Sequence, residues 1–483
     1  VYKTTKEFSD TKYQKSKKTK ADITNQFDNA DLNLYTNRGE NSVTYISRND
    51  WEGTVKLGYS EKYTKLNNQV KVKVNSAMVE DGKKMSLKLK KDDIPNPTYG
   101  KDNGLSLASM MSMDEKGNIQ IKDYDDPMWD DLLDELSFED TVMLLSNGLR
   151  KTYGIESINK PLTIDGNGAL GPVGGTNYSY DDNDSAAVNR FTFLYGDPDG
   201  DSSPISYPCA ALMASSRNDA LVEEVGRMVS EDCLWAGYSG LYGLGINIHR
   251  GSYNGRAFEY ASEDGTLAGY IAASEVKGIH SKGVYVYMKH AILNDQETNR
   301  EGVNTWANEQ TIRELYCRPF QIAIEEADAE NLMTGFNRIG VVWTSQQGFI
   351  NNVFRKEFGM SGFAVSDYWM NGYMDLVGGI LGGCALPDGD TAASAEKSSL
   401  YAFRDGYGTL TNAMREEAHR ILYTVVRSNA MNGIDVSTVF RTVTPPWMKL
   451  LNGISIAVYV LFGLSMVFCV FSIIYDETNL IKK

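Results

Sequence analysis

The sequence predicts an α/β protein built around a (β/α)8-type TIM barrel, with a partial β-containing region before the barrel and one transmembrane helix after it. Short apolar runs alternate with longer amphipathic segments through the middle of the chain, which is typical of strands and helices in a parallel sheet. Polar residues follow several of these runs, and an uncharged apolar stretch lies near the C-terminus. The predicted parts are a tail and linker (1–126), the barrel (127–432), a second linker (433–453), the transmembrane helix (454–475) and a terminal tail (476–483).

Composition excludes several classes of function. The chain has 483 residues, of which 42% are hydrophobic, enough for one large core and part of another. Its net charge of -15 argues against a nucleic-acid partner, since phosphate binding needs a basic face. Five cysteines without a CxxC motif and only four histidines predict free buried thiols, no metal and no cofactor. No signal peptide is visible, and the initial Val suggests a fragment or a processed product.

The first 150 residues change character along their length. Seven lysines fall in the first twenty residues, and we interpret them as a solvated segment rather than a phosphate or membrane patch. Residues 69–74 alternate polar and apolar side chains as a half-exposed strand does. Met128–Leu149 carries apolar residues at helical spacing, with Ser137 as the predicted cap of a second helix towards Asp140.

The barrel prediction comes from the segments that follow. Predicted strands are Pro161–Ile164, Leu244–Ile248, Val284–Met288, Asn331–Thr334 and Phe363–Ser366. Predicted helices are Asn218–Trp235, Glu263–Ser281, Glu309–Glu326 and Gln347–Phe358. Because the alternation extends over more than 250 residues, a closed barrel is favoured, with an open doubly wound sheet as the alternative.

Gly166–Gly171 matches the GxGxxG pattern of dinucleotide-binding loops. That motif requires a helix to open at the glycines, whereas Pro172 and the polar run 177–184 follow here. We therefore do not predict a nucleotide cofactor. The acidic loops 181–184 and 197–201 lack the ligand spacing of a calcium loop and are interpreted as solvated.

Polar side chains lie near the ends of the predicted strands, where barrel enzymes place their active groups. They are Asp165, Arg256, Lys289, His290, Asn337 and Asp367. Each alone has a common structural explanation, as a helix cap or a surface charge. Together they predict one pocket, with the Asp367 carboxylate at its mouth.

These segments resemble, in order, the barrel domain of family 3 glycoside hydrolases, typified by β-glucosidases. The resemblance covers roughly residues 127–430 and rests on Asp165-Gly166, Asn247–Arg250, Gly255–Asp264, Lys289-His290 with Asn294–Arg300, Met333–Asn337 and Val365–Asp367. It implies that Asp367 is the nucleophile. It also implies that Asp165, Arg256, Lys289 and His290 hold sugar hydroxyls.

Two positions near the nucleophile have open roles. Phe336 stands where family members commonly have tyrosine, which predicts one hydroxyl contact fewer at a substrate-binding position. Trp369 is expected either as an apolar platform for a sugar ring or as a core aromatic.

The acid/base of β-glucosidase-like members is a glutamate on a separate sandwich domain, which this chain does not display. The segment Val43–Thr54 resembles the trailing end of that domain in members with swapped domain order, so the glutamate is expected upstream of Val1. Asn294–Arg300 contains no His, which disfavours the N-acetylglucosaminidase-like subtype. The carboxylates inside the motifs are expected to have structural roles: Glu259, Glu263, Asp264, Asp295 and Glu297.

Residues 454–475 carry no charge and are long enough to cross a bilayer, so they predict a transmembrane helix rather than a buried core helix. The combined hypothesis is a membrane-anchored retaining hydrolase of β-glucosides, with the catalytic domain extracytoplasmic and an upstream sandwich domain of the same protein as a partner. The alternatives are a β-xylosidase of the same family, a catalytically impaired carbohydrate-binding module, and a structural scaffold.

Overall fold

The structure is a computed structural model that describes residues 15–31, 89–168, 170–172, 206–251, 254–297, 300–369, 374–389, 399–441 and 446–480. The chain separates into two compact units, residues 1–438 and 439–483. Several sequence predictions lie outside the described residues: the segment Val43–Thr54, the strand pattern at 69–74, and the acidic loops 181–184 and 197–201.

Residues 15–31 lie against the helical side of the first unit. Lys17 pairs with Glu326 at 2.8 Å, and Lys18 pairs with Asp328 at 2.6 Å. Phe27 is fully buried, next to the short 3-10 helix η2 (Asp28–Ala30). This part of the lysine-rich segment is therefore docked and not simply solvated, because a buried ring outweighs what a few exposed ion pairs contribute.

The segment before the sheet forms two helices. η4 (Leu107–Met110) and the hairpin of β1 (Met111–Met113) with β2 (Ile119–Ile121) precede α3 (Met128–Glu135) and α4 (Phe138–Ser146). Both helices bury the apolar residues that the sequence spaces at helical period. Ser137 caps α4 as predicted, since its Oγ accepts from the Asp140 N–H at 2.9 Å while the Asp140 carboxylate accepts from the Ser137 N–H.

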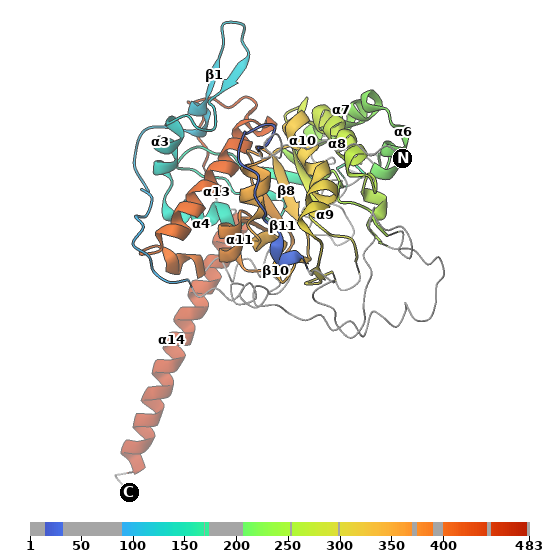
Figure 1. The fold of residues 1–483 in the computed structure, drawn as a ribbon. Helices are drawn as coiled ribbons and strands as arrows, with labels where there is room; N and C mark the ends of the chain where they lie inside the picture. Colours follow the sequence, from blue (N-terminus) through green and yellow to red (C-terminus); the bar gives the residue numbers. More distant parts are fainter. Residues whose placement is uncertain are drawn as a thin grey trace, which may run out of the picture. The chain divides into compact units, whose positions relative to one another are not determined.

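A seven-stranded sheet forms the centre of the first unit, in the order β12-β11-β8-β6-β5-β4-β3 (Figure 1). Its strands are β3 (Lys151–Thr152), β4 (Thr163–Asn167), β5 (Gly240–Tyr242), β6 (Tyr285–Ala291), β8 (Asn331–Thr334), β11 (Ala364–Tyr368) and β12 (Leu386–Asp388). All neighbours are parallel except β3 and β4, which are antiparallel. All seven residues of β6 are buried, as expected for a parallel strand covered on both faces.

The sheet curls so that its two edge strands approach one another. The Arg150 N–H, just before β3, donates to Asp388 Oδ1 of β12 at 3.0 Å. Gly148 lies so close to the Pro387 carbonyl that a Cβ there would overlap it. The predicted barrel-like α/β fold is confirmed at this level; the described residues supply seven strands, one of them antiparallel, where eight were predicted.

One predicted strand is displaced. The sequence favours Leu244–Ile248, but the structure pairs Gly240–Tyr242 with β4 and β6. Leu244 adopts a left-handed conformation with φ of 66°, which ends the extended backbone before the predicted strand begins. Both runs are buried, so apolar character alone does not distinguish them.

Helices cover the strands on the outside. α6 (Ala210–Ser216), α7 (Asp219–Trp235) and α8 (Gly265–His280) are followed by α9 (Glu309–Thr311), the π-helical turn η6 (Ile312–Tyr316) and α10 (Arg318–Ala327). α7 packs on α8 and α8 on α10 (Figure 1). Gly226 and Gly278 allow α7 and α8 to approach closely, since a Cβ on either would overlap the facing backbone.

The remaining elements are short, apart from one long helix. They are η5 (Ala257–Glu259), β7 (Asn304–Thr305), β9 (Arg338–Ile339), β10 (Val342–Trp343), η7 (Thr344–Gln346), η8 (Ile350–Arg355), α11 (Leu376–Gly382), η9 (Tyr401–Phe403), α13 (Gly408–Val426) and η10 (Asn429–Met431). β10, β9 and β7 form a small sheet of their own. Predicted helix 347–358 is realised as the π-helix η8.

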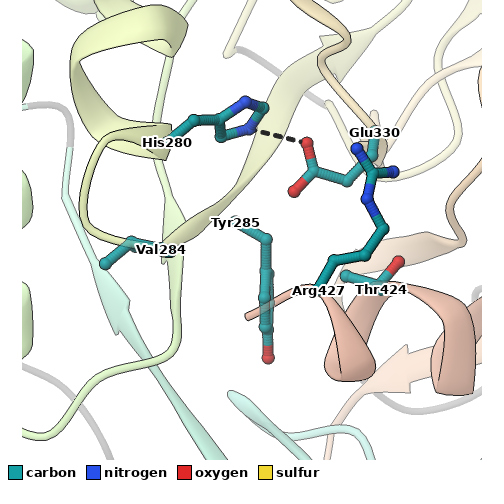
Figure 2. A pocket seen from close by; sticks show the side chains of 7 residues that line it. His280, Val284, Tyr285, Glu330, Thr424 and Arg427 are labelled. Atoms are coloured by element: carbon teal, nitrogen blue, oxygen red, sulfur yellow. Dashed lines mark ion pairs between the residues drawn. The ribbon is translucent and has the colours of Figure 1, made fainter. Parts of the chain in front are cut away.

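A small cavity of about 170 Å³ lies at the amino ends of β6 and β8 (Figure 2). His280, the last residue of α8, lies 2.8 Å from Glu330 through its Nε2, and Arg427 and Thr424 close the other side. Burial and the Arg427 charge act to lower the pKa of His280, but the Glu330 charge prevails and raises it above 6.5.

We expect His280→Gln to destabilise the protein more at pH 6 than at pH 9. A histidine with a raised folded pKa stabilises fully below the unfolded pKa of about 6.5, and that contribution disappears as the pH rises through the folded value. Urea unfolding at several pH values measures the difference. His249→Gln, at a partly exposed position, is the control. Equal destabilisation at both pH values would refute a charged His280–Glu330 pair.

The second unit contains α14 (Pro446–Leu480). The most apolar window of this helix lies between Pro446 and Tyr475, and none of that window is buried within the described residues. By length and composition the helix can cross a membrane, and it contains the predicted span 454–475.

Candidate active site

The predicted nucleophile and the Lys-His pair lie at the carboxyl ends of two strands of the same sheet. Asp367 is the fourth residue of β11, and Lys289 and His290 are the fifth and sixth residues of β6, with β8 between the two strands. Because parallel strands end at the same edge of the sheet, these side chains meet although they are about 80 residues apart in the chain.

The two oxygens of Asp367 have different surroundings. Oδ1 accepts a hydrogen bond from the Tyr368 N–H at 2.8 Å. Oδ2 is buried and accepts no hydrogen bond from the residues that the structure describes, and His290 Nε2 lies 3.3 Å from it. One oxygen is thus held by the backbone, while the other is available to a ligand.

Burial raises the pKa of Asp367, and the Arg256 charge, the Tyr368 N–H and the Lys289 charge counteract that rise. The nearby cations therefore favour the ionised carboxylate, which is the form that can act as a nucleophile. Arg300 acts in the same direction.

His290 is neutral in this site. Its burial, together with the Arg256 and Lys289 charges, lowers its pKa well below 6.5. Arg256 Nη2 lies 3.1 Å from Nε2, and Tyr260 Oη lies 2.9 Å from Nδ1. Because a guanidinium can only donate, Nε2 accepts, and the ring proton lies on Nδ1 facing the tyrosine.

Glu259 joins the two cations of the site. Its Oε1 accepts from Arg256 Nε, and its Oε2 lies 3.5 Å from Lys289 Nζ. Burial acts to raise the pKa of Glu259, but the Lys289 and Arg256 charges lower it. For Lys289, burial lowers the pKa and the Glu259 charge opposes this. The glutamate therefore has the structural role that the sequence suggested.

Three further motif carboxylates also have structural partners. Asp264 caps α8, with Oδ1 accepting from the Thr266 N–H at 2.8 Å. Asp295 accepts from Tyr316 and Asn247, and Glu297 pairs with Arg300 at 2.9 Å. Asp264 and Asp295 are engaged by these contacts, whereas Glu297 Oε1 is buried without a hydrogen bond among the described residues.

Asp165 lies deeper in the barrel than the Asp367 group. It is fully buried on β4, where Tyr285 Oη donates to Oδ1 at 2.6 Å and Tyr287 Oη donates to Oδ2 at 2.7 Å. Burial raises its pKa to about 6. Both of its oxygens accept hydrogen bonds from tyrosine hydroxyls in the structure, so the predicted contact with a sugar stays a prediction.

Asp388 is the residue that relates Asp165 to Asp367. Burial raises its pKa to about 6, and the negative charges of Asp367 and Asp165 add to that rise. Tyr242 Oη lies 3.5 Å from its Oδ1. The charges of Asp165 and Asp367 thus both act on Asp388.

The predicted aromatic positions are buried in this site's apolar lining. Phe336 and Trp369 are 1% and 4% exposed and belong to the same hydrophobic cluster. The Arg300 guanidinium stacks on the Phe336 ring at 4.2 Å. Asn337 is used structurally, since its Nδ2 donates to the Ile292 carbonyl and to Thr305 Oγ1.

Sequence reasoning missed Tyr260, Arg300 and Asp388 as parts of the site. Tyr260 and Arg300 lie within the segments Gly255–Asp264 and Asn294–Arg300, which resemble the family, so these motifs could have identified them. No motif marks the segment Leu386–Asp388 as part of the site. Among the residues that the structure describes, no group of three or more His, Cys, Asp or Glu side chains is arranged to hold a metal.

Comparison with known proteins agrees with this arrangement. Residues 201–383 match the glycosyl hydrolase family 3 N-terminal domain. This part of the chain belongs to glycosyl hydrolase family 3. The match includes Arg256, Lys289, His290, Phe336 and Asp367.

Relatives and solved structures extend the similarity. The chain is 38% identical over 167 residues to a β-glucosidase from Ruminococcus albus, covering 34% of this chain and 18% of that protein. It is 32% identical over 242 residues to a putative β-glucosidase from Schizosaccharomyces pombe, covering 50% of this chain and 27% of that protein. The structure of β-glucosidase 3B from Thermotoga neapolitana aligns with a TM-score of 0.54 and 26% identity, covering 64% of this chain and 44% of that one. The matches thus span less than a third of those curated relatives.

Proposed function

We propose that this protein hydrolyses terminal β-glucosidic bonds by a retaining double displacement in which Asp367 is the nucleophile. The observation that carries the proposal is the asymmetry of the Asp367 carboxylate: Oδ1 is held by the Tyr368 N–H, and the buried Oδ2 accepts no hydrogen bond from any residue that the structure describes. A nucleophilic carboxylate needs one oxygen for positioning and one for attack. The β-glucosidase relatives support the glucoside as substrate.

In this mechanism Asp367 Oδ2 attacks the anomeric carbon as the bond to the aglycone oxygen breaks. The departing oxygen takes a proton from an acid, and water then cleaves the glycosyl-aspartate, regenerating the carboxylate. Lys289, Arg256 and His290 are proposed to hydrogen-bond with sugar hydroxyls, and Asp165 is proposed for the same role at greater depth. The acid/base is proposed to come from a domain outside this chain.

An aryl β-glucoside with a good leaving group tests the proposal, because it needs little acid assistance. We expect a 2-deoxy-2-fluoro dinitrophenyl β-glucoside to release one equivalent of phenol and to leave a covalent adduct on the peptide that contains Asp367. The adduct is located by mass spectrometry. Asp264→Asn is the control: it removes another motif carboxylate but keeps the cap of α8, because asparagine also caps a helix, so the adduct should still form. Saturable sugar binding without an adduct would favour a binding module, and absence of both would favour a scaffold.

The glycone is tested with matched aryl β-glucoside and β-xyloside. A glucosidase is expected to prefer the glucoside, and the reverse preference would indicate the xylosidase alternative. A hydrophobic pocket distinguishes one hydroxymethyl group by about 1–3 kcal/mol, so the expected difference is about 10-fold to 200-fold.

Arg256→Gln is expected to shift the acid limb of kcat/KM to higher pH. Asp367 must be ionised to attack, and Arg256 is the strongest of the charges that keep its pKa from rising further. The pH profile with an activated glucoside measures the shift. Arg227→Gln, on the exposed face of α7, is the control. An unshifted acid limb in the Arg256 variant would contradict the assignment of that limb to Asp367.

We also propose that α14 anchors the protein in a membrane with the barrel on the extracytoplasmic side. Its 30-residue apolar stretch supports the proposal. Carbonate-resistant sedimentation with membranes, followed by protease accessibility of the barrel in sealed vesicles, tests the anchor and its orientation separately.

A further inference from the structure

Two stacked arginine–aromatic pairs lie beside the Asp367 group. The Arg300 guanidinium lies 4.2 Å from the centre of the Phe336 ring, and the Arg338 guanidinium lies 4.0 Å from the centre of the Trp343 ring. Gly302 lies between the pairs: its N–H donates to the Phe336 carbonyl at 3.0 Å, and a Cβ there would lie 2.9 Å from the Trp343 ring. The two pairs therefore form one continuous surface.

The small sheet places the second pair on the side of the site. Arg338 and Trp343 are partners across the β9–β10 pairing, so their side chains share one face. Ile339, on the opposite face, packs in the other hydrophobic cluster. Trp343 belongs to the same cluster as Phe336 and Trp369. The Arg338–Trp343 face thus packs on the same hydrophobic cluster as the aromatic residues of the site.

The two arginines differ in how their charge is balanced. Arg300 pairs with Glu297 at 2.9 Å. Arg338 has no acidic partner within the described part of the chain, and its buried Nε has no hydrogen bond there. Burial lowers the pKa of Arg338, with no carboxylate opposing that effect. A guanidinium that lies flat on an indole still presents its edge N–H groups, which suit a planar oxyanion.

The position relative to the nucleophile indicates which part of a substrate would meet Arg338. The Arg300 charge acts directly on Asp367 and His290, so the Arg300–Phe336 pair borders the reacting sugar. Gly302 separates Arg338 from the Arg300–Phe336 pair. A substrate that extends past the reacting sugar to Arg338 would place its aglycone there.

We propose that Arg338, supported by Trp343, recognises a carboxylate on the aglycone, so that the preferred substrates are acidic glucosides. This inference rests on the proposed function and specifies its substrate class. The carboxylate can belong to a phenolic acid or to a uronic acid sugar, because both present the planar oxyanion that Arg338 would bind. The protein as a whole carries a net charge of -15, which repels acidic substrates. A cation at this position provides a local attraction for the carboxylate.

The test compares a carboxyphenyl β-glucoside with its uncharged methyl ester, using the full chain and the Arg338→Gln variant. Leaving-group reactivity differs between the two substrates but cancels when the ratio of wild-type to variant kcat/KM is taken for each. We expect that ratio to be about tenfold larger for the carboxylate, since a hydrogen bond to a charged group contributes roughly 1.5–3 kcal/mol. Raising the salt concentration should reduce the effect.

Arg318→Gln is the matched control, because Arg318 bonds to Gln321 on α10 and not to the site. Equal ratios for acid and ester in Arg338→Gln would overturn the inference while leaving the proposed function intact. Failure of the wild-type chain to cleave a dinitrophenyl β-glucoside, which needs little acid assistance, would instead count against the proposed function. Competitive inhibition of that cleavage by a glucosyl uronic acid disaccharide and by the carboxyphenyl glucoside shows which source of carboxylate is preferred.

Discussion

Asp367→Gly should lower the turnover of an activated aryl β-glucoside by about 10,000-fold or more, the scale of loss found when a covalent nucleophile is removed. The reason is that Asp367 combines an oxygen that accepts no hydrogen bond from the described residues with the nearby charges of Arg256 and Lys289. The fold should survive, because Asp367 holds no other element in place through Oδ2.

Added azide distinguishes this outcome from simple loss of structure. In Asp367→Gly the azide can occupy the vacated space and displace the aglycone directly, which gives the α-glucosyl azide from a β-glucoside. Nuclear magnetic resonance identifies the anomer. Formation of the β-anomer, or retention of wild-type turnover without azide, would show that Asp367 is not the nucleophile.

Glu259→Gln should lower the free energy of unfolding by about 3–5 kcal/mol, which is the usual cost of leaving a buried charge without its partner. Lys289 is 4% exposed, and Glu259 is the carboxylate that its ammonium approaches. The destabilisation should decrease as the pH rises, because burial already lowers the pKa of Lys289 and loss of its proton removes the unpaired charge.

The double variant Glu259→Gln/Lys289→Met separates stability from activity. It should recover much of the lost stability, since no unpaired ammonium remains, yet stay poorly active because a cation beside Asp367 is gone. Glu139→Gln, which breaks the exposed pair with Arg404, is the control and should cost about 0–1 kcal/mol. Denaturant unfolding and the assay with an activated glucoside measure the two effects. A double variant no more stable than the single one would argue against the charge explanation.

Local sequence predicted those features whose cause is local. The cap of α4 by Ser137, the helix that ends at Trp235 and the buried strand, predicted at Val284–Met288 and found at Tyr285–Ala291, follow from spacing and side-chain chemistry within a few residues. The strand-end position of Asp367 follows in the same way. The Gly240–Tyr242 strand was misplaced because a neighbouring run is equally apolar, and only pairing with β4 and β6 selects between them.

By itself, the sequence determined the alternation of strands and helices, the order of the motifs and the apolar C-terminal helix, because these depend on periodicity and composition. Tertiary structure decided which charged side chains have a hydrogen-bond or ion-pair partner and which have none among the described residues. Asp165 accepts a hydrogen bond from Tyr285, 120 residues away in the chain, while one oxygen of Asp367 accepts none from the described residues. Among those residues Arg338 also lacks the carboxylate partner that Arg300 has. Hydrogen bonds and charge pairs of this kind depend on contacts between distant segments, and those contacts form only when the sheet curls.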